Sequence, residues 1–170
     1  PVPEGQIAIA RDFAIVLNDN GHQTLIGGNE NYKQLRSSER ISKVAAAFCG
    51  YMALTERGNI ITCGNTREFD RSYEIECLHR VKDIVACEGH TVVLLDDGTV
   101  KSIDEPGGWE GVPQHYKVAK DWREIKQVAV GFSNIMGLTE AGTVLYHSVD
   151  GYTNPHFYDD CSDVVQIDCY

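Results

Sequence analysis

The sequence predicts an all-β protein built from about four copies of one small unit. A leucine followed four residues later by a glycine recurs about every 40 residues along the chain. The segments on both sides of each leucine–glycine turn are short, apolar and rich in β-branched residues, as strands are. No helical periodicity of comparable length competes with this pattern. The four pairs are Leu17 with Gly21, Leu54 with Gly58, Leu94 with Gly98, and Leu138 with Gly142.

Each unit contains a β-hairpin. The eleven residues that end at each leucine align without gaps as IAIARDFAIVL, VAAAFCGYMAL, IVACEGHTVVL and VAVGFSNIMGL. A second apolar run follows each glycine, and it reads TLIGG, NIITCG, TVKSI and TVLYHS. Glycine at the turn supplies the positive φ that other residues resist. Several strands per unit at this period predict a β-propeller-like array or a solenoid of sheets.

An apolar pair spaced three residues apart opens the later units. The pairs are Ile41 with Val44, Val81 with Ile84, Ile125 with Val128, and near the C-terminus Val164 with Ile167. In the first unit Glu4 stands in the place of the first member. We therefore expect a single propeller-like domain over residues 1–170, with a closing or fifth-repeat strand at 164–170. The expected repeats span about 6–40, 41–80, 81–124 and 125–163.

Features that recur in every unit are interpreted as scaffold, and features that occur once are candidates for function. An aromatic residue recurs ten or eleven residues after each turn glycine, and blade packing is its simplest explanation. Asp96 and Asp97 resemble an acid/base pair in isolation, but they align with the NDN, TER and TEA turns and are predicted to be turn residues. The recurring aromatics are Tyr32, Phe69, Trp109 and Tyr152.

Several stretches resemble the repeat of the regulator-of-chromosome-condensation family of β-propellers. GGNENYKQL (27–35) is similar to the family's G-x-N-E-Y-G-Q-L signature with one extra residue, and CGNTREF (63–69) keeps its first half. The family core of strand, G-x-x-H-T, strand and D-G-T-V is matched by DIVACEGHTVVLLDDGTV (83–100) and by WREIKQVAVGFSNIMGLTEAGTV (122–144). The resemblance covers nearly the whole chain.

The resemblance implies four-stranded blades around a central axis and protein binding through one face of the propeller. One branch of the family acts as an exchange factor for a small nuclear GTPase, but the loops that this activity requires have no match here. Only His90 keeps the repeated histidine, whose family role is to fix loops by hydrogen bonds, and Phe13, Gly50 and Asn134 stand at its other positions. Family propellers usually have about seven blades, within the range of ~4–8 that propellers adopt. Four repeats therefore indicate a small closed ring, half of a larger or dimeric propeller, or a fragment.

Composition restricts the partners. The chain of 170 residues has a formal net charge of −10 and no basic block, so we expect no binding to nucleic acid or to an anionic membrane surface. No apolar run is long enough to span a bilayer. The six cysteines are scattered, form no C-x-x-C pair and follow no visible secretory signal, which predicts buried thiols in a reducing, cytoplasmic location. A protein partner fits this acidic chain, and solubility alone also explains the charge.

Known catalytic and phosphate-binding motifs are absent from the sequence. The NDNG stretch resembles part of a calcium loop, but Val16 stands where the first carboxylate should be. Cys87 with His90, and Cys77 with His79, lack the further ligands that a metal requires. We therefore expect no enzyme activity, no cofactor and no bound metal.

Two stretches that do not repeat are the first candidate binding surface. They cover 104–121 and 149–160, where aromatic side chains on loops are typical of protein recognition. The alternative is that these aromatics form outer strands of the blades. The candidate partner-binding residues are Trp109, His115, Tyr116, Tyr152, His156, Phe157 and Tyr158.

The short segments RDF, FCG, EGH and FSN between the first two strands should cluster at one mouth of the channel, which is the second candidate surface. An enzyme or small-ligand binder that uses this mouth around His90 is the alternative to an interaction module. Self-association that completes a propeller is a third possibility. The channel-mouth candidates are Arg11, Asp12, Phe13, His90 and Asn134.

Overall fold

Four three-stranded antiparallel sheets make up the part of the chain that the computed structural model describes. The described residues are 6–10, 12–28, 37–47, 50–64, 76–87, 90–104, 119–131, 134–148 and 163–168. In each sheet the second strand lies between the first and the third. The predicted all-β, propeller-like array of four blades is confirmed, and we call the sheets blades 1 to 4 in chain order.

The strands of each blade are consecutive in the sequence. Blade 1 holds β1 (Gln6–Ile9), β2 (Phe13–Leu17) and β3 (Gln23–Gly27), and blade 2 holds β4 (Ile41–Ala47), β5 (Gly50–Thr55) and β6 (Ile60–Gly64). Blade 3 holds β7 (Val81–Cys87), β8 (His90–Leu95) and β9 (Val100–Asp104), and blade 4 holds β10 (Ile125–Val130), β11 (Asn134–Thr139) and β12 (Val144–Ser148).

The leucine–glycine signature has two structural causes. All four turn glycines adopt a positive φ between 77° and 84°, which only glycine takes without strain. They also approach the backbone that opens the next unit: a Cβ on Gly98 would lie 3.1 Å from Glu124 Cα, and one on Gly58 would lie 3.1 Å from the backbone of Val81. The carbonyl oxygen of Gly98 accepts a hydrogen bond from the amide of Ile125 at 3.1 Å. The glycine therefore makes the turn and joins neighbouring blades.

The hydrophobic core lies between the blades, in layers where the faces of adjacent sheets meet. Alternation along each strand sends successive side chains to opposite faces, so every inner blade contributes to two layers. Ile15 packs with Tyr51 between blades 1 and 2, and Met52 packs with Ile84 between blades 2 and 3. Val92 packs with Ile135 and other residues between blades 3 and 4. This explains why strands such as β5 are buried on both faces.

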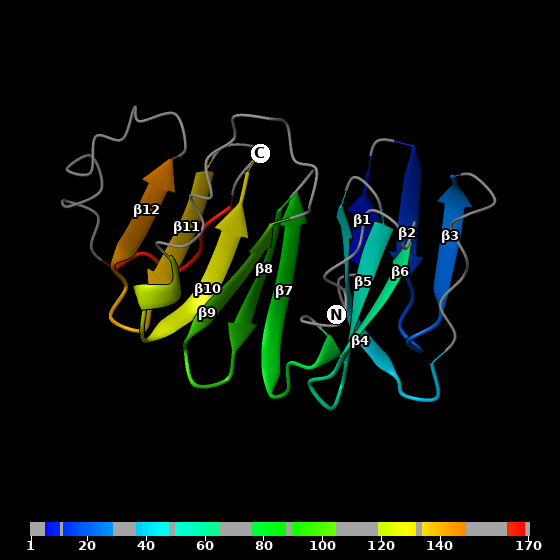
Figure 1. Cartoon of the computed structure of the whole chain (residues 1–170), viewed down its shortest axis with the longest axis horizontal. Helices are drawn as coiled ribbons and strands as arrows, with labels where there is room; N and C mark the ends of the chain where they lie inside the picture. The colour runs from blue at the N-terminus through cyan, green and yellow to red at the C-terminus, as the bar shows by residue number, and fades with distance from the viewer. Residues whose placement is uncertain are drawn as a thin grey trace.

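The blades stand side by side in an open row, with blade 1 and blade 4 at its two ends (Figure 1). The first strands lie next to one another in sequence order, with β1 against β4, β4 against β7, and β7 against β10. The four described blades therefore form an open array and not a small closed ring, which was one of the arrangements that the sequence allowed.

A short C-terminal segment, residues 163–168, lies along the outward face of blade 4 (red in Figure 1). Its first residue, Asp163, has a φ of 60°, close to the 62° of Arg80 and the 57° of Glu124, which precede the first strands of blades 3 and 4. The amide of Val164 donates to the carbonyl oxygen of Gly142 at 3.3 Å, as the amide of Ile125 does to Gly98. The segment thus begins with the same backbone conformation and the same hydrogen bond as the first strands of blades 3 and 4.

Some sequence expectations fall outside the described residues. The four-stranded blades that the resemblance implies, and the recurring aromatics, concern residues 29–36, 65–75, 105–118 and 149–162. Cys77 is exposed, so the expectation of buried thiols is wrong for this residue; Cys63 and Cys87 are half-buried, and none of the three is in a disulfide. Over the described ranges, the structure has no helix with the length and hydropathy to cross a membrane.

Candidate functional site

The two candidate surfaces begin at the same end of the blades. In every blade the residue that starts the second strand pairs with the residue that ends the third strand. His90 pairs with Asp104, where the stretch 104–121 begins, and Asn134 pairs with Ser148, just before the stretch 149–160. The arrowheads of β3, β7, β10 and β12 all lie along the upper side of the row in Figure 1. We call this side of the array the mouth edge.

The seven partner-binding candidates (Trp109, His115, Tyr116, Tyr152, His156, Phe157 and Tyr158) all lie outside the described residues. The structure describes the ends of the strands from which their loops start. These anchors are firm, because β8 and β11 carry buried side chains on both faces, among them Val92, Val93, Ile135 and Leu138. A rigid scaffold that presents variable loops at one edge is the common architecture of binding proteins.

The channel-mouth candidates differ in their surroundings. Phe13 is only 3% exposed and its ring meets that of Tyr51 at a centroid distance of 6.3 Å, inside the layer between blades 1 and 2. Asp12 is exposed, and its carbonyl oxygen accepts a hydrogen bond from the amide of Gly28 at 2.9 Å. Asn134 is half-buried and its carbonyl oxygen accepts from the amide of Gly131. Arg11 and the side chain of His90 lie outside the described residues.

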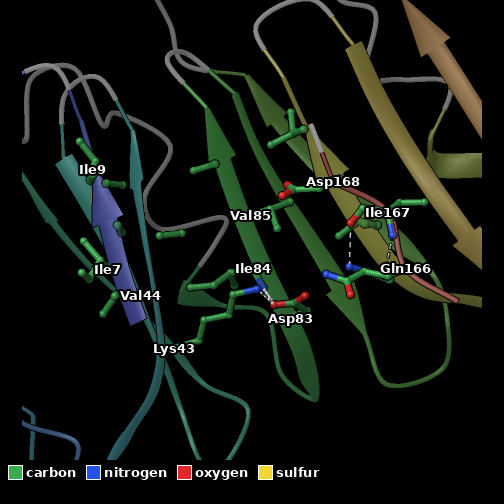
Figure 2. Close-up of a pocket in the computed structure, with 18 residues that line it drawn as sticks. Ile7, Ile9, Lys43, Val44, Asp83, Ile84, Val85, Gln166, Ile167 and Asp168 are labelled. Carbon is green, nitrogen blue, oxygen red and sulfur yellow. Dashed lines mark hydrogen bonds and ion pairs between the residues drawn. The ribbon is translucent and has the colours of Figure 1, made fainter. Parts of the chain in front are cut away.

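An open groove of about 370 Å³ runs along the first strands of all four blades (Figure 2). Its floor combines apolar side chains with backbone, and its margins are formed by β1 on one side and by residues 166–168 on the other. Lys43 and Asp83 form an ion pair in it, and Asp83 also accepts a hydrogen bond from the amide of Ile84 at 2.8 Å. Figure 2 shows this pair near the centre of the groove, between Ile7 and Gln166.

One polar position in each first strand forms a hydrogen bond or an ion pair with a neighbouring unit, and sequence analysis missed it. Gln6 donates to the carbonyl oxygen of Ser42 at 3.1 Å and accepts from the amide of Val44 at 3.3 Å. Gln127 also makes two hydrogen bonds to backbone, but both go to one residue: it donates to the carbonyl oxygen of Ile167 at 2.9 Å and accepts from the amide of Ile167 at 3.2 Å. At the same position in blades 2 and 3, Lys43 and Asp83 form the ion pair. The sequence signal was a polar residue directly before each opening β-branched residue.

No cluster of three or more His, Cys, Asp or Glu side chains is placed to hold a metal ion within the described part of the chain. The contacts that the structure does show hold the blades together. Side chains of the first strands join the blades, the hairpin turns close their lower side, and the mouth edge carries the starting points of the loops.

Comparison with known proteins identifies the fold. No protein-family model matches the chain, and neither does any curated protein sequence. Among solved structures, Prp20p (RCC1) of the yeast Saccharomyces cerevisiae is 16% identical with a TM-score of 0.60, over 94% of this chain and 49% of that one. That structure was described together with its binding to Gsp1p and histones, and another shows yeast RCC1 bound to Kap60.

Two further structures are similar. Human WBSCR16 is 16% identical with a TM-score of 0.59, over 87% of this chain and 49% of that one. The ectodomain of the receptor kinase CR4 from Physcomitrella patens is 11% identical with a TM-score of 0.61, over 84% of this chain and 37% of that one. The chain spans about half the length of the yeast and human structures. The architecture expected from the sequence is therefore present, and the fold of this chain is that of the RCC1-like repeat β-propellers.

Proposed function

We propose that this chain is a cytoplasmic, non-enzymatic protein-interaction module that binds a partner protein through the loops of its mouth edge. One observation carries the proposal. The stretches that hold the non-repeating aromatic residues start at Asp104 and next to Ser148, and both of these residues lie at the mouth edge beside His90 and Asn134. Side chains from two blades can therefore contribute to one binding surface.

The fold and the charge support this proposal. Yeast RCC1, which shares the fold, binds Gsp1p, histones and Kap60, so the architecture is suited to protein ligands. The net charge of −10 favours a partner with a neutral or basic surface, and it opposes binding to nucleic acid or to an anionic membrane. Aromatic side chains of the kind found in these loops dominate the binding energy of many protein interfaces.

The test is affinity capture from the source cell with matched baits. We would compare the wild-type chain with a Trp109→Ala/Tyr116→Ala variant, a Phe157→Ala/Tyr158→Ala variant and a Lys101→Ala control, whose side chain is exposed on β9. The proposal expects proteins that are retained by wild type and by the control but are lost with either loop variant. Capture that is identical for all four baits, or that recovers nothing in repeated trials, would contradict it.

A second candidate function is binding of a small ligand, which the groove of about 370 Å³ along the first strands favours. A volume of this size is within the range that small-molecule sites occupy, although such sites are usually more enclosed. A thermal-shift screen of small molecules against wild type and Gln166→Ala, which removes an exposed side chain that lines the groove, separates the two functions. A ligand that stabilises only the wild type, with both proteins equally stable alone, would favour this second function.

A further inference from the structure

The outward face of blade 1 is apolar, and none of the described strands packs on it as a neighbouring blade. Ile7 and Ile9 of β1 are 63% and 75% exposed, and Ile26 of β3 is 56% exposed. In the repeat alignment Ile7 takes the place of Val44, Ile84 and Val128, which are 5%, 0% and 2% exposed because the preceding blade covers them. The repeat thus places a residue that packs between blades at a position that none of the four described blades covers.

The exposed residues form one contiguous patch across three strands. Ile7 pairs with Val16 and Ile9 pairs with Ala14 between β1 and β2, and Ala14 pairs in turn with Ile26 of β3. Cross-strand partners lie on the same face of a sheet, so the five side chains share one surface. We call this patch, formed by Ile7, Ile9, Ala14, Val16 and Ile26, the start face.

At the opposite end of the array, the outward face of blade 4 is covered, and its covering segment shows what can pack on such a face. Blade 4 presents Ala129, Met136, Leu138 and Val144 outward, and we call these residues the end face. Val164 and Ile167 of the C-terminal segment pack on them, and Ile167 is buried. Gln127 binds the backbone amide and carbonyl of Ile167, so this contact does not depend on the side chain.

We propose that a second copy of this chain docks head to tail, with the start face of one copy packed on the end face of the other in place of residues 163–168. Ile7 and Ile167 occupy the same position of the repeat, so β1 is built to lie where the segment now lies. The interface would add a further layer to the three that already lie between consecutive blades, 1 with 2, 2 with 3 and 3 with 4.

The size of the array supports a partner of this kind. Two copies of four blades give eight, which is the upper end of the ~4–8 blades that propellers usually contain. Each copy spans 49% of the yeast and human chains with the same fold, so two copies match the length of one such chain. This inference rests on the proposed interaction function only in that the partner is a protein, and it uses a different surface from the mouth edge.

Two opposing effects set the strength of the association. Residues 163–168 compete from within the same chain, where their effective concentration is high, so they hold back docking of a second copy. Each copy also carries a charge of −10, so repulsion between copies weakens the association and added salt strengthens it. Weakening the segment should therefore favour the dimer, whereas a charge on the start face should oppose it.

Sedimentation over a range of concentrations, with the full chain in moderate salt, tests the proposal with three single variants. Ile7→Asp places a charge on the start face, Ile167→Asp weakens the C-terminal segment, and Val165→Asp adds the same charge at an exposed residue of that segment. We expect reversible association of wild type, at least a tenfold weaker dimer for Ile7→Asp, a several-fold stronger dimer for Ile167→Asp and no change for Val165→Asp. Val164→Asp, at a half-buried residue of the same segment, replaces Ile167→Asp if that variant does not fold.

Other outcomes overturn the proposal. A monomer at all concentrations for both wild type and Ile167→Asp shows that no second copy occupies the start face. Association that Ile7→Asp weakens but that neither segment variant strengthens indicates two start faces packed together, which is a different assembly.

The two functions are tested separately. Loss of partner capture by the loop variants, with the dimer unchanged, separates the mouth-edge function from the docking of a second copy.

Discussion

Thr99 donates two hydrogen bonds to Asp97, one from its backbone amide at 2.9 Å and one from its hydroxyl at 2.6 Å. The pair closes the hairpin turn between β8 and β9, next to Gly98. These hydrogen bonds favour the charged carboxylate and lower the pKa of Asp97 below its usual value of 3.8. The residue that could be mistaken for a catalytic acid is thus a structural acceptor.

Asp97→Asn is expected to reduce the dependence of stability on acid pH. Because the pKa of Asp97 is lower in the folded state, its contribution is present above pH 3.8, the unfolded value, and is lost as the pH falls through the folded value. The variant lacks this titration, so its melting temperature should fall less between pH 4 and pH 2, an interval of about two units around the ordinary Asp pKa. Asp96→Asn, which breaks the ion pair with Arg80, is the control, and equal acid sensitivity in both variants would refute the assignment.

Gly98→Ala is expected to destabilise the chain by about 2 kcal/mol or more. Left-handed backbone costs a non-glycine residue about 1–2 kcal/mol, and the added Cβ would also press on the backbone of Glu124 and Ile125 at 3.1 Å. Urea denaturation measures the change. Lys101→Ala, at an exposed position of the same hairpin, should stay within about 0.5 kcal/mol of wild type. A similar loss in both variants would show that the turn conformation is not the cause.

The ion pair between Lys43 and Asp83 is expected to couple blades 2 and 3 weakly. A double-mutant cycle with Lys43→Met and Asp83→Asn should give a coupling free energy of about 0.5–1 kcal/mol, because both side chains remain partly exposed. The coupling should shrink in 1 M salt, where the screening length is about 3 Å. A coupling that is zero at low salt would mean that the pair does not stabilise the interface.

Gln127→Ala is expected to loosen the C-terminal segment. Loss of the two hydrogen bonds to Ile167 should speed hydrogen exchange at the Ile167 amide about fivefold or more, since one such bond contributes about 1 kcal/mol. Gln166→Ala removes the neighbouring exposed glutamine and is the matched control. Equal exchange at Ile167 in both variants would show that the glutamine at 127 does not hold the segment in place.

The sequence was sufficient to predict the blades because only one type of residue fits the backbone conformation and the space at each recurring turn. The turn glycines need a positive φ and little space, which no other residue combines, so they stand out in the alignment. The contacts between first strands were not predictable in the same way. An amide, an ammonium group and a carboxylate perform the equivalent task at Gln6, Lys43 and Asp83, so no residue type repeats.

The candidate site was less predictable than the scaffold. The alignment with His90 predicts Phe13 at the channel mouth, but its side chain lies in the core. Its alternation with Ile15 and Leu17, which are also buried, was the available signal. The two stretches start at the same edge because of strand pairing, His90 with Asp104 and Asn134 with Ser148, which the single sequence does not display.

The sequential contacts of β1, β4, β7 and β10 make this molecule nearly one-dimensional. Its stability should behave as a sum of terms for single blades and for nearest-neighbour interfaces, as in other repeat proteins. Within the described structure, blade 1 is held through one interface and blade 2 through two, so melting should begin by fraying at the first sheet and then progress inward. The molecule would then lose its order blade by blade rather than all at once.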